Sequence, residues 1–126
     1  MIATSLKTVL VADDTPQIAH IVRVGLQRAG CRVLVASGGH DALRSADSER
    51  VDLLIFDVEM PGMTGFELLQ QIRRKPGYAN VPVIFVTGSG DPDVHAQAAS
   101  LGASGFFTKP FSPVDLERRA MKLLGL

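Results

Sequence analysis

The sequence is poor in several residue types that mark particular classes of protein. Among its 126 residues there is no tryptophan, one tyrosine and one cysteine, Cys31. A lone cysteine cannot form an internal disulfide, and no partner completes a CxxC or CxxH metal-binding pattern around it. These absences exclude a disulfide-stapled secreted domain and a cysteine-based zinc module, and they favour a reducing cytoplasmic environment.

The chain also lacks an excess of charge of either sign and any long apolar run. Thirteen Lys and Arg residues balance thirteen Asp and Glu residues, so the molecule has no overall positive field to gather nucleic acid. No stretch approaches the roughly 20 apolar residues that cross a bilayer, and no basic segment leads into a signal-like apolar run. We therefore expect a cytoplasmic protein that binds neither nucleic acid nor membrane directly.

What the sequence does contain fits one globular domain. A length of 126 residues is close to the usual size of a single domain. Apolar residues make up 46% of the chain and charged residues 21%, a balance typical of folded soluble proteins. We see no internal repeat, low-complexity run or linker, and we predict one domain over 1–126.

Short apolar or β-branched runs alternate with stretches of helical periodicity. The runs are nearly continuous in apolar character, which is typical of strands covered on both faces. They predict strands at 8–13, 31–36, 52–57, 81–87 and 104–108. The helical periodicity predicts helices at 16–29, 39–48, 64–75, 92–101 and from 113 onward. Five such alternations predict a doubly wound α/β domain, in which right-handed crossovers place helices on both faces of a parallel sheet.

Some helix ends carry specific capping residues. Thr64 followed by Glu67 forms a capping-box pattern at the start of the third helix. Gly30 is a typical stop for the first helix, and Pro113 after Ser112 is typical of the first turn of the fifth. These residues fix the predicted boundaries more firmly than periodicity alone.

Chemically active side chains stand at the carboxyl ends of the predicted strands, where open parallel sheets bind their ligands. They are Asp13, Asp14, Asp57, Thr87 and Lys109. Three carboxylates at one edge repel one another unless a cation compensates them, and Mg²⁺ accepts one or two carboxylates together with phosphate oxygens. Lys109 adds a positive charge and Thr87 a hydroxyl donor, so the edge is suited to a phosphoryl group.

Four segments around these residues resemble the receiver domains of two-component response regulators. They are Val-Ala-Asp-Asp at 11–14, Phe-Asp-Val-Glu-Met-Pro-Gly-Met-Thr-Gly at 56–65, Val-Pro-Val-Ile-Phe-Val-Thr-Gly at 81–88 and Gly-Phe-Phe-Thr-Lys-Pro-Phe at 105–111. The resemblance covers nearly the whole chain and is specific in combination. It implies a flavodoxin-like (βα)5 fold, with a five-stranded parallel sheet in the order 2-1-3-4-5, and phosphorylation of Asp57.

The resemblance also implies a set of ligands for Mg²⁺. Asp14 is implied as a direct acidic ligand and Asp13 as one that acts through water. Asp57 and the backbone carbonyl of Glu59 complete the implied site. The expected cofactor is therefore Mg²⁺.

Four further residues take implied roles in catalysis and switching. Lys109 would pair with Asp57 or with a phosphoryl oxygen, and the Lys109–Pro110 peptide bond would be cis. Thr87 would move to hydrogen-bond the phosphoryl group. Phe106 stands where the family often has a tyrosine that swings with this hydroxyl, so the chain keeps the ring but lacks the phenol.

The implied function is a signalling module and not an enzyme. A histidine kinase or histidine phosphotransfer protein would supply the phosphoryl group. A downstream effector would bind the face formed by the fourth helix, fifth strand and fifth helix. Many DNA-binding members carry two acidic residues that pair across a dimer at the position of Ser104-Gly105. Because this chain lacks them, we expect a monomer or a weak dimer.

Two other functions use related residues. A Mg²⁺-dependent phosphohydrolase of the haloacid-dehalogenase type also has an aspartate nucleophile, but it usually carries a second aspartate two residues later, where this chain has Glu59. It would also need a cap insertion, which is missing here. An FMN-binding flavodoxin would need a phosphate-cradling Ser/Thr/Gly loop after the first strand, where this chain has Asp13-Asp14.

Several other residues have a plain structural interpretation. Gly62 and Gly65 either permit a turn and a helix start or shape the loop after Asp57. The side chains of Glu59 and Ser89 are expected to flank the path of water toward the phosphorus. Three histidines share no metal-like spacing and are expected to face solvent: His20, His40 and His95.

Overall fold

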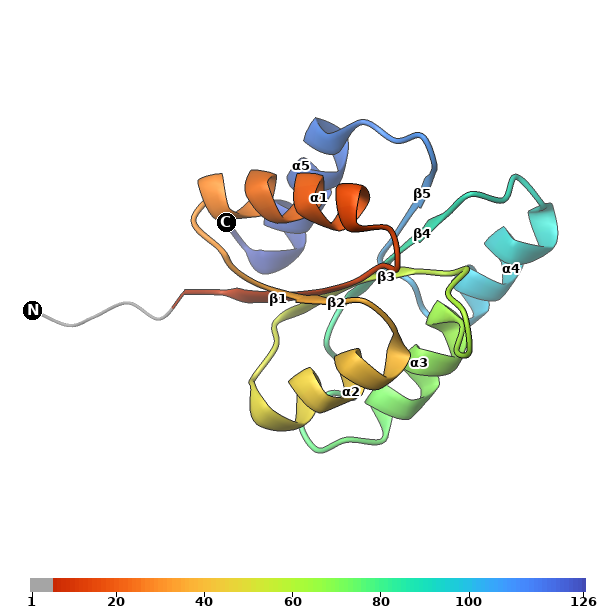
Figure 1. Ribbon diagram of the computed structural model, residues 1–126, viewed down its shortest axis with the longest axis horizontal. Helices are drawn as coiled ribbons and strands as arrows, with labels where there is room; N and C mark the ends of the chain where they lie inside the picture. Colours follow the sequence, from red (N-terminus) through yellow and green to blue (C-terminus); the bar gives the residue numbers. More distant parts are fainter. Residues whose placement is uncertain (1–5) are drawn as a thin grey trace, which may run out of the picture.

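The computed structural model describes residues 6–126, which alternate between strand and helix five times (Figure 1). The elements are β1 (Thr8–Ala12), α1 (Pro16–Arg28), β2 (Arg32–Ala36), α2 (Gly39–Ser48), β3 (Leu53–Asp57), α3 (Gly65–Arg73), β4 (Val83–Thr87), α4 (Pro92–Ser100), β5 (Gly105–Thr108) and α5 (Pro113–Leu124). Every predicted element is present, with its ends within two residues of the predicted ones.

The strands form one parallel sheet in the order β2-β1-β3-β4-β5. This is the flavodoxin-like order that the resemblance implied, and it is confirmed. The middle strands β1, β3 and β4 are buried along their whole length, which explains why their sequences are apolar without alternation. Because all strands point the same way, their carboxyl ends share one edge of the sheet.

Helices cover both faces of the sheet (Figure 1). On one face, Leu26 of α1 and Leu116 of α5 join a core cluster with residues of β1, β3 and β4. On the other, Ala42 of α2, Phe66 of α3 and Ala98 of α4 join a second cluster. The sheet therefore lies as a middle layer between two hydrophobic cores.

Local signals in the sequence determine where the helices begin. The Thr64 hydroxyl accepts from the N–H of Glu67 at 3.1 Å, and the Glu67 carboxylate accepts from the N–H of Thr64 at 3.0 Å. The predicted capping box is thus confirmed, and it starts α3 a short loop after β3.

None of the helices in residues 6–126 combines the length and the apolar character needed to cross a bilayer.

Candidate functional site

An acidic cluster lies at the carboxyl edge of the sheet. One carboxylate oxygen from each of Asp13, Asp14 and Asp57 lies within 4.8 Å of the others. The Lys109 ammonium, after β5, is 3.4 Å from Oδ2 of Asp13 and 3.4 Å from Oδ1 of Asp57. The Lys109–Pro110 peptide bond is cis. Parallel strands therefore bring together three carboxylates and one ammonium from distant parts of the sequence.

The environment of Asp57 is unfavourable to its negative charge. Only 3% of the surface of Asp57 is exposed to solvent. Burial, together with the nearby charge of Asp13, raises the pKa of Asp57 to about 7, although Lys109 opposes the change. Within residues 6–126, Oδ1 of Asp57 is the one fully buried side-chain oxygen or nitrogen without a hydrogen-bond partner. The site thus holds a buried carboxylate whose charge is incompletely balanced.

Asp13 and Asp14 differ in their surroundings. Asp13 is buried, with Oδ1 accepting from the Thr15 N–H at 2.8 Å and Oδ2 facing Lys109. Asp14 is exposed at the mouth of the site. The oxygens of Asp13 are therefore already engaged with the protein, whereas Asp14 stands where a ligand enters from solvent.

The cluster has the donor chemistry of a magnesium site. Carboxylate oxygens are the hard ligands that Mg²⁺ prefers, and the ion usually keeps several waters beside one or two carboxylates. A cation among Asp13, Asp14 and Asp57 would offset the repulsion between the carboxylates, one of which has a buried oxygen that accepts no hydrogen bond. The residues present therefore fit Mg²⁺.

Thr87, at the end of β4, is fully buried and makes a contact that the sequence did not reveal. Its hydroxyl donates to Oε2 of Glu59 at 2.6 Å, and the N–H of Gly88 donates to Oε1 of Glu59 at 2.9 Å. We expected the Glu59 side chain beside a water path, but here it bridges two loops. The adjacent positions of β3 and β4 in the sheet, where Asp57 pairs with Val86, explain the proximity.

Phe106 and Phe107 lie on opposite faces of β5, as the alternation of a strand requires. Phe106 packs against the core cluster under α2, α3 and α4, whereas Phe107 packs with Phe111 on the other side. The ring of His95 on α4 lies 3.9 Å from the ring of Phe106, centroid to centroid. His95 is exposed, as expected, yet its contact with Phe106 was not predicted.

The glycines after Asp57 have distinct structural roles. Gly62 adopts a φ of +80°, a left-handed conformation that favours glycine. At Gly65 a Cβ atom would overlap the carbonyl oxygen of Asp57, and its N–H donates to the carbonyl of Val58 at 2.9 Å. Gly62 therefore permits a turn, and Gly65 allows α3 to begin against the end of β3.

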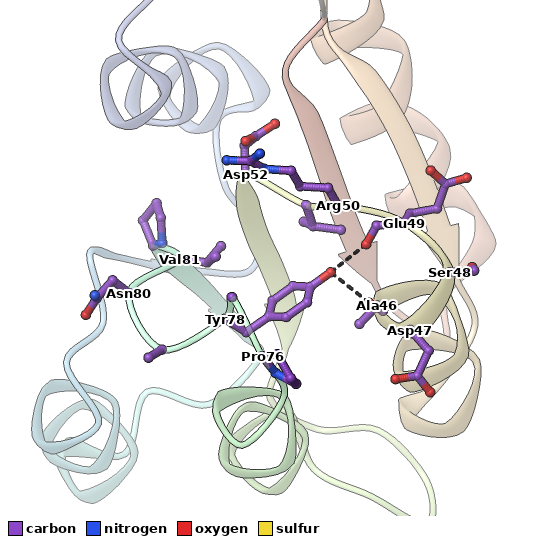
Figure 2. A pocket seen from close by; sticks show the side chains of 14 residues that line it. Ala46, Asp47, Ser48, Glu49, Arg50, Asp52, Pro76, Tyr78, Asn80 and Val81 are labelled. Atoms are coloured by element: carbon purple, nitrogen blue, oxygen red, sulfur yellow. Dashed lines mark hydrogen bonds between the residues drawn. The ribbon is translucent and has the colours of Figure 1, made fainter.

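A hollow of about 790 Å³ lies away from this cluster, between the loops that precede β3 and β4. Figure 2 shows the Tyr78 ring directed toward the end of α2, with its hydroxyl contacting the carbonyls of Ala46 at 3.0 Å and Glu49 at 2.7 Å. The Arg73 guanidinium donates to the carbonyls of Tyr78 and Val81. These polar groups already have protein partners, so the acidic cluster is the better candidate for chemistry.

Comparison with known protein families matches residues 9–121 to the response regulator receiver domain. The alkaline phosphatase synthesis transcriptional regulatory protein PhoP of Bacillus subtilis is 33% identical over 118 residues, covering 94% of this chain and 48% of that protein. The transcriptional regulatory protein KdpE of Mycobacterium tuberculosis is 39% identical over 103 residues, covering 82% and 44%. The chain thus spans about half the length of these curated relatives.

Solved structures give the same match across the fold. The chemotaxis protein CheY4 of Vibrio cholerae has a TM-score of 0.88 and 34% identity, covering 94% of this chain and 99% of that one. The response regulator DrrB of Thermotoga maritima has a TM-score of 0.84 and 29% identity, covering 96% and 54%. The similarity therefore extends over nearly all of the present chain.

Proposed function

Since this chain belongs to the response regulator receiver domain family of two-component signalling, we propose that Asp57 is its phosphoacceptor. The donor is a phosphohistidine on a histidine kinase or a histidine phosphotransfer protein. The observation that carries the proposal is the buried Oδ1 of Asp57, which lies inside an acidic cluster, accepts no hydrogen bond and faces only the Lys109 ammonium at 3.4 Å. Membership of a signalling family favours this function over a phosphohydrolase.

The transfer is a displacement at phosphorus. A carboxylate oxygen of Asp57 forms a bond to phosphorus, the P–N bond of the phosphohistidine breaks, and its electron pair stays on the imidazole nitrogen. Lys109, 3.4 Å from Asp57, stabilises negative charge on the phosphoryl oxygens. A Mg²⁺ ion held by Asp14, Asp57 and the backbone carbonyl of Glu59, with Asp13 acting through water, would supply further positive charge there.

The phosphoryl group then changes a binding surface. Thr87 hydrogen-bonds a phosphoryl oxygen, and Phe106 on the neighbouring strand follows this movement. The pairing of β4 with β5 supports this coupling, because Thr87 lies opposite Thr108 and Phe85 opposite Phe106. The altered surface of α4, β5 and α5 binds the downstream effector in one of two populated states.

The extent, location and oligomeric state of the domain are a further part of this proposal. We propose that 1–126 forms one receiver domain that works in the cytoplasm as a monomer or weak dimer, without contacting nucleic acid itself. The curated relatives named above are transcriptional regulatory proteins about twice as long as this chain.

A small phosphodonor tests the proposal. Incubation with acetyl phosphate and Mg²⁺ should add one phosphoryl mass to the protein, and the product should be labile to hydroxylamine, as acyl phosphates are. Asp57→Asn should abolish the modification, and chelation of Mg²⁺ should suppress it in the wild-type protein. Intact-mass spectrometry measures the modified fraction.

A matched control is Asp52→Asn, which changes the same residue type immediately before β3. Asp52 accepts a hydrogen bond from the N–H of Thr8 and lies at the opposite edge of the sheet. This variant should be phosphorylated like the wild type. Modification of Asp57→Asn to the wild-type level would contradict the assignment of the acceptor.

A further inference from the structure

The Glu59 side chain occupies two hydrogen-bond donors beside the acidic cluster. Both of its carboxylate oxygens are used, one by the Thr87 hydroxyl at 2.6 Å and the other by the Gly88 N–H at 2.9 Å. Thr87 is fully buried, whereas Glu59 is largely exposed. The exposed side chain of Glu59 thus accepts a hydrogen bond from the buried hydroxyl of Thr87.

The single hydrogen of the Thr87 hydroxyl makes this contact exclusive. The N–H of Ser89 donates to Oγ1 of Thr87 at 3.0 Å, so that oxygen already acts as an acceptor. Its own hydrogen is directed to Glu59, because a carboxylate can only accept. While the contact with Glu59 lasts, Thr87 has no hydrogen to donate to another anion.

A phosphoryl group on Asp57 would need the same donors. Carboxylate and phosphoryl oxygens are both anionic acceptors that form short, charge-assisted hydrogen bonds. We propose that the Glu59 carboxylate is an internal competitor of the phosphoryl group, holding Thr87 and Gly88 until phosphoryl oxygens displace it. The inference rests on the proposed role of Asp57 and deepens it by naming the contact that must break.

Displacement of Glu59 is compatible with its position. The carboxylate can turn into solvent and recover hydrogen bonds from water, and its charge repels an incoming dianion. The resting arrangement is therefore stabilised by Glu59, and the phosphorylated arrangement must overcome that stabilisation. The binding-competent fraction of the resting protein is lowered accordingly, which weakens the apparent affinity for a phosphoryl mimic.

Two variants separate the contact from the charge. Glu59→Ala removes both acceptors. Glu59→Asp keeps the negative charge but shortens the side chain by one methylene, so that it no longer bridges Thr87 and Gly88. The backbone carbonyl at position 59 is retained in both proteins.

Titration with beryllofluoride at fixed Mg²⁺, followed by NMR, measures the competition. Glu59→Ala and Glu59→Asp should each bind the mimic about tenfold more tightly than the wild type, the size expected from losing a charge-assisted competing hydrogen bond. Before any mimic is added, the Gly88 amide resonance should already differ from the wild-type position in both variants. Unchanged resonances from the sheet verify that each variant is folded.

A double-mutant comparison tests whether the effect acts through the hydroxyl. In a Thr87→Ala background, removal of the Glu59 side chain should increase the affinity much less than in the wild type, because one contested donor is already gone.

Each of the remaining outcomes is decisive. If Glu59→Ala gains affinity while Glu59→Asp behaves like the wild type, charge alone acts and the competitor role is overturned. Wild-type affinity in both variants overturns it as well, while leaving Asp57 as the acceptor. If none of the folded proteins binds beryllofluoride, the proposed function itself fails, and this inference fails with it.

Discussion

At the amino edge of the sheet, the Tyr78 hydroxyl contacts two backbone carbonyls (Figure 2), whereas at the carboxyl edge Oδ1 of Asp57 is buried without a hydrogen-bond donor. The amino edge also has the Arg73 guanidinium bonded to loop carbonyls. The carboxyl edge instead gathers carboxylates around one lysine. At the amino edge the Tyr78 hydroxyl and the Arg73 guanidinium have hydrogen-bond partners within the protein. At the carboxyl edge a buried carboxylate oxygen has none, so a ligand or a cation can interact with it.

This difference distinguishes residues that stabilise the fold from candidate functional residues. A buried polar group with protein partners contributes to folding, and its removal leaves those partners unsatisfied. A buried charge without adequate partners opposes folding, and its retention is explained by a function that needs it. Substitutions at the two edges should therefore change stability in opposite directions.

The largest effect is expected at Tyr78. Tyr78→Ala should lower the free energy of unfolding by about 3–4 kcal/mol, because it removes a buried aromatic ring and leaves a cavity. Tyr78→Phe should cost about 1 kcal/mol, because only the hydroxyl is lost. Urea denaturation followed by circular dichroism measures both. If Tyr78→Phe destabilises as much as Tyr78→Ala, the contacts of the hydroxyl and not the packing of the ring dominate.

A smaller effect of opposite sign is expected at Asp57. Without Mg²⁺, Asp57→Asn should raise the free energy of unfolding by about 1–3 kcal/mol, because it removes a buried charge beside Asp13 and supplies an N–H donor. Added Mg²⁺ should stabilise the wild type more than the variant. Asp52→Asn, the control at the other edge, should give no such gain. A loss of stability in Asp57→Asn under chelation would refute the contrast between the edges.

The same comparison predicts a dependence on pH. The pKa of Asp57 rises on folding from 3.8 to about 7, so the folded state binds its proton more tightly than the unfolded state. Its contribution therefore favours folding below pH 3.8 and is lost as the pH rises toward 7. The advantage of Asp57→Asn over the wild type should accordingly grow across this range under chelation.

The smallest effect is expected at His95 of α4, whose ring lies against Phe106 of β5. His95→Ala should lower the free energy of unfolding by about 0.5 kcal/mol, because it removes one contact between an exposed ring and the half-buried ring of Phe106. It should nevertheless shift the NMR signals of the Phe106 ring. Gln97→Ala, at another exposed position of α4, should leave those signals in place. Equal shifts in both variants would indicate a general change in α4.

The helices and strands could be predicted from short-range patterns, and the cluster from the parallel arrangement that their alternation implies. Continuous apolar runs predicted the buried strands, and the Thr64 capping box set the start of α3. The parallel arrangement then placed the carboxyl end of each strand at one edge. The order of the strands came from the resemblance, because periodicity alone does not determine which strands are neighbours.

Contacts between loops could not be predicted in the same way. The bridge from Glu59 to Thr87 depends on the paths of two loops that meet only in three dimensions. The contact of His95 with Phe106 depends on how α4 lies against β5. The register of β3 with β4, once known, suggests the contact between Glu59 and Thr87. No local sequence pattern predicts this contact or the one between His95 and Phe106.

Gly65 approaches the carbonyl of Asp57 so closely that only glycine fits at this position. Glycine is a poor helix former in helix interiors, but here it stands at the first position of α3, directly after the N-cap Thr64. Even a methyl group would have to push the end of β3, and with it the Asp57 carboxylate, out of its present place in the cluster. The absence of a side chain at Gly65 therefore lets the first turn of α3 pack directly against the backbone of Asp57 and hold the end of β3 in place.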